Sequence, residues 1–420
     1  MLRRQFLVRT GAALGAAALA SARRAHARAS ARDTDLQDWG AVRALFDVDP
    51  ARAHLAGFFL SSHPRPVRAA VDRWRAALDR DPVACWLEHH DERDAAVATA
   101  AARYLGVEAK DVALTDSTTM GLGLVYGGLE LTEGDQVLAS PHEHYSTLAS
   151  LAFVAQRSRA EIVEVPLYES SREASVDEIV ASVDSGLGPR TRAVALTWVH
   201  SKSGLRLPVR AIADRISERY ADRAPSERPL LCVDGVHGLG AVPGPPAEMG
   251  CDVFIAGTHK WMFAPRGTGI VWAHPRAWAR IAPVIPPFGA HDQPGSLHTP
   301  GGFHSFEHRW AVDEAFLLHE RIGKERVYAR VRALNAVLLE ELAAMPHVRL
   351  FTPAAAGLTA GIVCFVVGDL DPWAIVERLA ERDVVASVSP YEPSYARLSA
   401  GLLNDEADLE RALAAVRALA

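Results

Sequence analysis

The apolar residues between about 95 and 275 form short continuous runs, separated by stretches with helical periodicity. Such runs are typical of strands buried on both faces of a mostly parallel sheet. Apolar residues recur at helical spacing across 176–183, and Pro208 opens another helical stretch that runs to Tyr220. The alternation predicts an α/β sheet covered by helices on both faces. The expected strands are 112–115, 136–139, 161–165, 193–198, 230–233, 252–256 and 269–273.

The rest of the chain predicts a smaller unit. Residues 282–302 are rich in Pro, Gly and His, which favours a linker or loop over a regular element. A long helix is expected over 311–345, with an interruption near Gly323. The remainder of the chain is typical of a small α+β domain, with one apolar strand and two helices at 362–367, 372–382 and 405–419.

Residues 1–27 have the pattern of a secretory signal peptide. Arginines at 3–4 precede a Gly, Ala and Leu run at 11–20, which is shorter than the ~20 residues needed to span a bilayer, so no stable membrane anchor is expected. The small-x-small run at 25–27 predicts cleavage after Ala27. With the Phe-Leu pair at 6–7, the arginines resemble a twin-arginine (Tat) signal, which implies the Tat export machinery as a partner and a periplasmic or extracellular mature protein.

Composition narrows the function. The chain has 420 residues, 49% of them hydrophobic, which supports a large core and excludes a disordered or fibrous protein. The formal net charge is −6 and the mature region has no dense Lys/Arg block, so no nucleic-acid partner is expected and small-molecule chemistry is favoured. The four cysteines lack CxxC or metal-ligand spacing, which predicts buried free thiols and no metal site. We expect a Tat leader (1–27), an N-terminal segment packing on the small domain (28–60), a large α/β domain (61–305) and a small domain (306–420).

Two neighbouring predicted strands end in side chains suited to covalent chemistry. Asp234 and His237 follow one strand, and His259 and Lys260 follow the next, at the sheet edge where α/β proteins bind ligands. A lysine amine can form an imine with the aldehyde of pyridoxal phosphate (PLP), while a carboxylate pairs with the ring nitrogen. Such a carboxylate favours the protonated ring by ~1 to 3 pKa units. By residue type alone, Asp234 and Lys260 also fit a structural ion pair.

The Asp-x-x-His run at 234–237, the His-Lys pair ending in Lys260 and the Gly-rich turn at 265–269 resemble class V aminotransferases and cysteine desulfurases. This resemblance covers most of the mature chain. It implies the PLP-dependent transferase fold of type I, a mixed, mostly parallel sheet between helices with a smaller α+β C-terminal domain. It also implies that PLP forms a Schiff base with Lys260, that Asp234 holds the ring nitrogen and that His237 lies near the ring oxygen.

The resemblance also implies a phosphate-binding cup. Ser117, Thr118 and Thr119 start a Gly-rich helix after strand 112–115, where free N–H groups and hydroxyls can hold a dianionic phosphate. An ordinary helix N-cap explains the same residues equally well.

Two positions depart from the family pattern. Gly257 stands where relatives usually have a serine three residues before the lysine, so Thr258 or His259 is expected to compensate. Residues 303–308 replace a Gly-Thr that relatives often contribute to the phosphate of the partner subunit, so none of them is assigned to the site.

Three further roles come from the resemblance. His144 is expected to stack on the cofactor ring, with His142 as a decoy, and Ser201 takes the position of an Asn that binds the ring hydroxyl. Arg397, followed by Asn404, resembles the arginine that binds the substrate α-carboxylate, because a guanidinium matches a carboxylate in bidentate geometry. Taken alone, Arg397 also fits a solvated surface charge.

The shared mechanism starts when the freed Lys260 removes the Cα proton of an amino substrate, and it then diverges. We predict a class V aminotransferase acting on an amino acid or related amine, as a homodimer that closes the site. Residues 384–395 contain no cysteine, which disfavours a desulfurase. The run at 58–64 is similar to the isopenicillin N epimerase-like branch, so an epimerase or racemase is the first alternative, beside a lyase. A non-enzymatic exported binding protein is the other.

Overall fold

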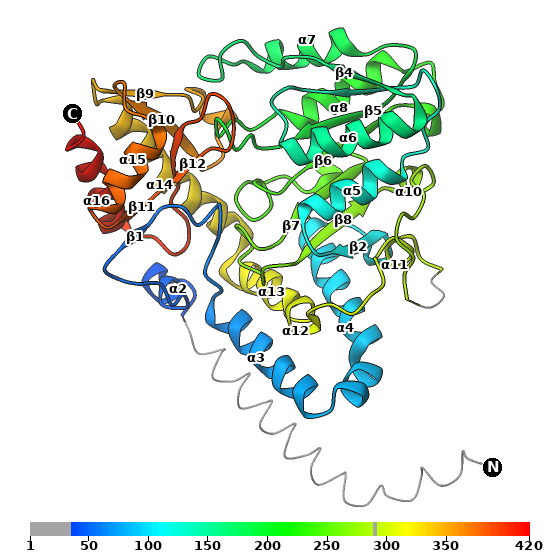
Figure 1. The fold of residues 1–420 in the computed structure, drawn as a ribbon, viewed down its shortest axis with the longest axis horizontal. Coiled ribbons are helices and arrows are strands. Elements are labelled where there is room, and N and C mark those ends of the chain that lie inside the picture. Colours follow the sequence, from blue (N-terminus) through cyan, green and yellow to red (C-terminus); the bar gives the residue numbers. More distant parts are fainter. Residues whose placement is uncertain (1–34, 289–291) are drawn as a thin grey trace, which may run out of the picture.

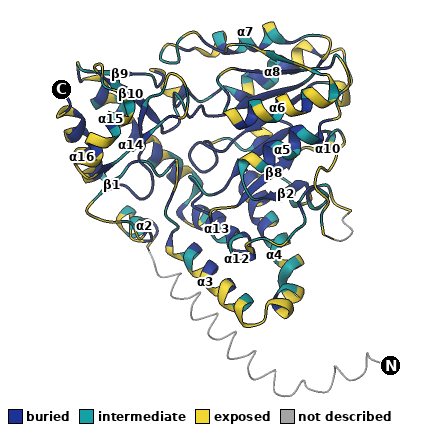
Figure 2. Ribbon diagram, viewed as in Figure 1, coloured by how far each residue is buried: buried dark blue, intermediate teal, exposed yellow. Residues whose placement is uncertain are grey.

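The computed structural model describes residues 35–288 and 292–420, so the predicted leader lies outside the described residues. Within this part, the chain forms a large unit around a seven-stranded sheet and a smaller unit around a four-stranded sheet (Figure 1). The central strands of the large sheet are buried, whereas its edge strand at 161–164 is not, and exposed residues gather on the outer sides of the helices (Figure 2). No helix in the described ranges is both long and apolar enough to cross a membrane.

The large sheet has the strand order β2-β8-β7-β6-β5-β3-β4. All neighbouring pairs are parallel except those of β8, which runs antiparallel to β2 and β7. The predicted strands are confirmed with ends shifted by a residue or two. Their bounds are β2 Val112–Thr115, β3 Gln136–Ala139, β4 Glu161–Glu164, β5 Thr191–Thr197, β6 Leu230–Asp234, β7 Val253–Gly257 and β8 Gly269–Ala273.

Helices pack on both faces of this sheet because successive strand residues point to opposite sides. Val137 packs with Leu151 of α6 on one face, whereas Leu138 packs with Ile179 of α7 on the other. Helix α5 contacts α6, and α7 contacts α8. The helices of the large unit are α3 Arg65–Arg80, α4 Pro82–Leu105, α5 Thr118–Gly128, α6 Tyr145–Ser158, α7 Val176–Gly186, α8 Val209–Arg219, α9 Pro246–Met249, α10 Pro275–Trp278, α11 Pro294–Leu297 and α12 Phe306–Arg309, with 3-10 turns at Ala109–Asp111 and Pro225–Glu227.

The small unit is an antiparallel sheet of order β12-β13-β10-β9, covered by helices. Chain from the N-terminal side joins it, because β1 pairs in parallel with β11. The long predicted helix is confirmed as two, broken at Gly323, whose φ of +98° a helix cannot contain. Helix α13 Val312–Ile322 packs on α3 and α4 of the large unit and leads into α14. The elements of the small unit are α2 Trp39–Arg43, β1 Ala53–His54, α14 Lys324–Ala343, β9 Val348–Leu350, a 3-10 turn at Ala356–Leu358, β10 Val363–Val367, α15 Pro372–Ala380, β11 Val384–Val385, β12 Ser387–Val388, β13 Ala396–Leu398 and α16 Glu406–Arg417.

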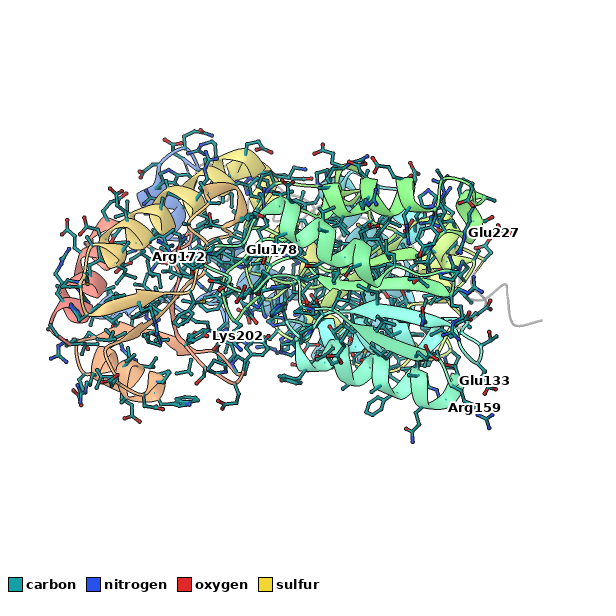
Figure 3. The ribbon with its side chains drawn as sticks, turned by 90° about the horizontal axis from the view of Figure 1, so that it is seen from above. Glu133, Arg159, Arg172, Glu178, Lys202 and Glu227 are labelled. Atoms are coloured by element: carbon teal, nitrogen blue, oxygen red, sulfur yellow. The ribbon has the colours of Figure 1, made fainter. Side chains whose placement is uncertain are left out.

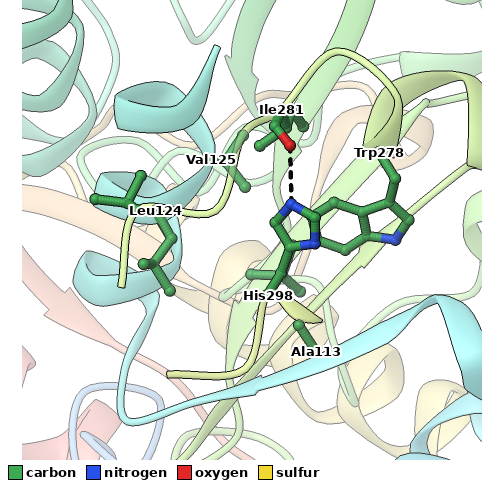
Figure 4. A pocket seen from close by; sticks show the side chains of 8 residues that line it. Ala113, Leu124, Val125, Trp278, Ile281 and His298 are labelled. Atoms are coloured by element: carbon green, nitrogen blue, oxygen red, sulfur yellow. Dashed lines mark hydrogen bonds between the residues drawn. The ribbon is translucent and has the colours of Figure 1, made fainter. Parts of the chain in front are cut away.

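The segment after β8 corrects one expectation, because it contains the short helix α11 where we predicted only a loop. Pro294 occupies the first turn of α11, where a missing N–H costs nothing. His298 then stacks on Trp278 at 4.1 Å between ring centroids, and its Nε2 lies 2.8 Å from the carbonyl oxygen of Ile281 (Figure 4). These contacts hold His298, at the end of α11, beside a small apolar pocket that Trp278 and Ile281 also line.

The two units meet along loops at the ends of the large-sheet strands. Figure 3 shows them side by side, with Arg172 and Lys202 near the junction. Arg172 donates to the carbonyl of Thr352 at 2.9 Å, and Lys202 donates to the carbonyl of Glu392 at 2.9 Å. Each contact links a loop of the large unit to the small unit, so side chains from both can reach one site.

Candidate active site

Lys260 lies in the turn after β7, and its Nζ is 3.0 Å from Nε2 of His237. Burial lowers the pKa of Lys260 to about 8, while Asp234 opposes this shift and Arg397 adds to it. Roughly a tenth of the amine is therefore neutral at pH 7, far more than for an ordinary lysine. The neutral amine is the nucleophilic form, so Lys260 is a better nucleophile at neutral pH than an exposed lysine.

Asp234 ends β6, and its side chain is buried with 3% exposure. Its Oδ1 accepts a hydrogen bond from the N–H of Val236 at 3.0 Å. Burial raises the pKa of Asp234 to about 6, against the opposing effects of that N–H and of Lys260. A buried carboxylate of this kind favours a cationic partner, which the protonated ring nitrogen of a pyridine supplies. Position 235 is glycine because a Cβ there would overlap the Phe254 ring.

His237 is buried, and burial and then the positive charge of Lys260 lower its pKa, so its ring is neutral. Its Nδ1 is buried without a hydrogen-bond partner in the described part of the chain. Phe58 packs 5.9 Å from the His237 ring, centroid to centroid. An orphaned buried nitrogen beside the reactive amine fits a polar atom of a ligand.

His144 is the N-cap residue of α6, and its Nδ1 accepts from the N–H of Ser146 at 3.2 Å. Burial, followed by the charge of Lys260, lowers the pKa of His144 to about 4, so its ring is neutral. His142 lies in a different environment, stacked on Tyr168 at 4.0 Å between centroids. His144 therefore lies within electrostatic reach of Lys260, as the predicted stacking role requires. The His142 ring packs against Tyr168 instead.

The predicted phosphate cup lies at the start of α5. Ser117 caps this helix by accepting from the N–H of Met120 at 3.0 Å, so the N-cap interpretation is confirmed for its hydroxyl. Thr118 Oγ1 accepts from the N–H of Gly257 at 2.8 Å, and Thr119 Oγ1 donates to Ser146 at 3.3 Å. The three residues therefore join the α5 start to β7 and α6, close to the lysine turn.

Gly257 leaves room for the His259 ring. A Cβ at position 257 would lie 2.9 Å from Thr118 Oγ1 and 3.0 Å from Cε1 of His259. Thr258 is fully buried, with its hydroxyl 2.6 Å from that of Thr268. His259 keeps its Nδ1 buried without a partner in the described residues. Of the two residues expected to compensate for Gly257, His259 is the better placed.

His63 lies within electrostatic reach of His259 and of two arginines. Burial, followed by the charges of Arg266, His308, Arg68 and His259, lowers the pKa of His63 to about 4. The Nε2 of His63 is buried and has no hydrogen-bond partner among the described residues. Clustered positive charge beside an unsatisfied imidazole fits a dianionic phosphate.

Arg397 lies on β13 and is 3% exposed. Its Nε donates to Ser387 Oγ at 3.2 Å, and its terminal nitrogens donate to the carbonyls of Ser201 at 3.0 Å and Val388 at 2.8 Å. A guanidinium has five N–H donors, so one remains on each terminal nitrogen. No carboxylate within the described ranges forms an ion pair with Arg397. This buried cation, 4.9 Å from the centroid of the Phe58 ring and with two donors unpaired among the described residues, can bind a ligand carboxylate.

Ser201 follows β5, and its Oγ lies 2.7 Å from the hydroxyl of Tyr391 in the small unit. This contact occupies the side chain that we predict to bind the cofactor hydroxyl, and that role stays a prediction. Sequence reasoning missed Tyr391, although it precedes Arg397 in the segment inspected only for cysteine. It also missed Glu143, which is 2% exposed and whose pKa burial raises to about 8. Glu143 lies between His142 and His144 in the sequence.

The buried lysine, the buried acid at the neighbouring strand end and the neutral histidine beside them fit the cofactor PLP. The chain belongs to the class V aminotransferase family, whose model matches residues 92–410. This match confirms the predicted family and, with it, the predicted PLP cofactor, whereas similarity to solved structures confirms the fold type.

Among curated relatives, isopenicillin N epimerase from Streptomyces clavuligerus is 27% identical over 403 residues, covering 91% of this chain and 98% of that protein. A probable cysteine desulfurase from Pseudomonas aeruginosa is 30% identical and covers 72% of this chain and 76% of its own length. Among solved structures, a lysine mutant of C-DES with glycine covalently linked to the PLP cofactor superposes with a TM-score of 0.82 and 22% identity, covering 89% and 98% of the two chains.

Proposed function

We propose that this protein is a PLP-dependent enzyme that removes the Cα proton of an amino acid and returns a proton to the opposite face, as an epimerase or racemase. The observation that carries the proposal is the proximity of Lys260, whose amine has a lowered pKa, to Arg397, a buried guanidinium with two donors that are unpaired among the described residues. Similarity to isopenicillin N epimerases over almost their whole length supports inversion as the outcome.

Each residue of the site has its own part in this reaction. PLP, when bound, supplies an electron-withdrawing ring that stabilises negative charge at the substrate Cα. Asp234 would hold the ring nitrogen of the cofactor in its charged form, and His144 would stack on the cofactor ring. Arg397 holds the substrate carboxylate, which fixes the orientation of the Cα–H bond. The Nζ of Lys260 would hold the cofactor and, when free, would take the Cα proton.

Transamination is the second candidate, favoured by the family to which the chain belongs. It requires Lys260 alone to move the proton, and it uses the same anchoring residues. Desulfuration is disfavoured on structural grounds. Cys364, which pairs with Arg397 across the small sheet, is fully buried in β10, and burial raises its pKa to about 12, so it is not a thiolate nucleophile.

The test follows both chirality and nitrogen. Purified holoenzyme is incubated in D₂O with a panel of L- and D-amino acids, with and without keto acids, and products are resolved by NMR and chiral chromatography. Inversion with solvent deuterium at Cα and no new keto acid supports the epimerase. Nitrogen transfer to a keto acid moves the assignment to the aminotransferase. A colourless protein that resists PLP loading and exchanges no Cα proton supports a non-enzymatic binding protein.

We also propose a homodimer. Val83, Leu87, Phe288 and Phe303 are between 38% and 80% exposed, and the rings of Phe288 and Phe303 lie 5.5 Å apart. Exposed apolar residues gathered in this way are typical of a protein–protein interface. Light scattering is expected to give twice the chain mass, and Phe303→Glu to give monomer. Phe153→Glu, at another exposed phenylalanine on α6, is the matched control.

Export is the remaining proposal, and it rests on the sequence of residues 1–27 alone. Fusion of this leader to a folded reporter is expected to deliver the reporter outside the cytoplasm. Replacing the pair Arg3 and Arg4 by lysines is expected to abolish delivery if the route is Tat, whereas unchanged delivery would contradict it.

A further inference from the structure

Tyr391 lies in the loop between β12 and β13, shortly before Arg397. Its ring meets that of His144 edge-on, with centroids 6.3 Å apart and planes at 87°. Its hydroxyl is 2.7 Å from Oγ of Ser201. The phenol is therefore close to the residue that we assign to the cofactor ring and to the arginine that we assign to the substrate carboxylate.

Ser201 fixes Tyr391 and Arg397 relative to each other. The Ser201 carbonyl accepts from the Arg397 guanidinium at 3.0 Å, while the Ser201 hydroxyl pairs with Tyr391. Both partners come from the small unit, whereas Lys260 follows β7 of the large sheet. A carboxylate held by Arg397 would therefore lie near a phenol from the small unit, whereas the amine of Lys260 comes from the large one.

We infer that Tyr391 is the acid that delivers a proton to the substrate Cα on the face opposite Lys260. This inference rests on the proposed inversion and names its second catalytic residue. Lys260 Nζ takes the Cα proton, and the bonding pair stays on the substrate. The Tyr391 O–H bond then breaks as its proton forms the new C–H bond. The resulting phenolate regains a proton from water through the Ser201 hydroxyl, and the Lys260 ammonium releases one to water, so charge and atoms balance.

The protonation of Tyr391 suits this role. Burial raises the pKa of Tyr391 to about 12, although the Ser201 hydrogen bond and the Arg397 charge act in the opposite direction. The phenol is therefore protonated at neutral pH and available as a donor. No other step of the proposed reaction uses this hydroxyl.

The test compares wild-type holoenzyme with Tyr391→Phe in D₂O, using the L-amino acid panel and following Cα by NMR and chiral chromatography. The wild type is expected to give inverted product carrying solvent deuterium. Because a positioned acid or base contributes ~10² to 10⁴-fold, Tyr391→Phe is expected to lose inversion by about that factor. Exchange of the Cα proton with retention, which needs only Lys260, is expected to persist in the variant.

Tyr395→Phe is the matched control on the same loop. The Tyr395 ring stacks on Phe351 at 3.7 Å between centroids, and loss of its hydroxyl is expected to leave inversion at the wild-type rate. Two measurements separate chemistry from folding: the urea midpoint of each protein and borohydride labelling of Lys260 by PLP. Both are expected to be unchanged in Tyr391→Phe.

The possible outcomes separate the role of Tyr391 from the proposed function. Inversion by Tyr391→Phe at the wild-type rate overturns the role of Tyr391 and leaves the epimerase intact. Joint loss of inversion, Lys260 labelling and stability in that variant shows a structural role and overturns the inference. Wild-type exchange with retention only overturns inversion and Tyr391 together. No exchange of any panel member by wild type, with Lys260 labelled, overturns the proposed function itself.

Discussion

Nζ of Lys260 and Nε2 of His237 lie in hydrogen-bond contact at 3.0 Å. Because the His237 ring is neutral, Nε2 can accept from the lysine ammonium, which leaves the ring proton on Nδ1. That Nδ1 is buried and unpartnered among the described residues. The contact therefore positions the amine and, at the same time, leaves a donor on the other side of the ring for a ligand.

The reactivity of Lys260 is expected to depend on pH. Only the neutral amine attacks an aldehyde, so labelling of the apoprotein by PLP and borohydride is expected to rise with pH, with a midpoint near 8. Asp234→Asn removes a negative charge that raises this pKa, so its midpoint is expected to be lower. Peptide mapping measures position 260, with exposed Lys110 as internal reference for the reagent. A higher midpoint in the variant would contradict the electrostatic assignment.

Arg397→Gln is expected to weaken binding of substrates with a free carboxylate. A hydrogen bond to a charged group contributes ~1.5 to 3 kcal/mol, so KM is expected to rise about 10- to 150-fold, more than kcat falls. The corresponding amino acid amide is the control, because it lacks the negative charge. Equal losses for acid and amide would show that Arg397 acts only through its bonds to Ser387, Ser201 and Val388.

Gly235→Ala is expected to destabilise the protein and disturb Asp234. The new methyl would overlap the Phe254 ring, and overpacking of this kind costs ~1 to 3 kcal/mol. Gly123→Ala on α5 is the matched control, since no atom lies within 4 Å of its Cβ position and alanine favours a helix. Urea unfolding measured by circular dichroism compares both. Equal stability of the two variants would show that the β6 turn tolerates a side chain.

The four cysteine thiols are expected to be unreactive towards thiol reagents in the native protein. All four cysteines are free and buried, so a thiol reagent is expected to modify none before unfolding and four afterwards. Alkylation of the native enzyme is accordingly expected to leave Cα chemistry unchanged. Loss of activity on modification of one native thiol would return a desulfurase-like mechanism to consideration.

The sequence predicted the large sheet well, because strands such as β6 and β7 are continuous apolar runs that fit few other structures. Gly323 likewise marked the break between α13 and α14. Helix α11 was missed because four residues in a Pro- and Gly-rich context carry no periodicity, and its position depends on contacts of His298 with Trp278.

The site was predictable where function requires fixed residue types. Lys260 and Asp234 meet because parallel neighbouring strands end at one edge, which spacing alone indicates. Tyr391 was not predictable in this way, since its hydroxyl reaches Ser201 only through packing of the small unit against the large one. The choice between Thr258 and His259 also depended on the turn, which directs the threonine hydroxyl inwards to Thr268.

The buried guanidinium at position 397 has a practical consequence for finding the substrate. A buried cation without a counter-ion in the described fold destabilises the native state, and a bound anion offsets that cost. Any ligand that binds only the native state raises the free energy of unfolding. Resistance to heat can therefore rank a library of carboxylic acids without knowledge of the reaction. Compounds that raise the Tm of the wild type, but not of a variant without that cation, would show which carboxylic acids resemble the natural substrate.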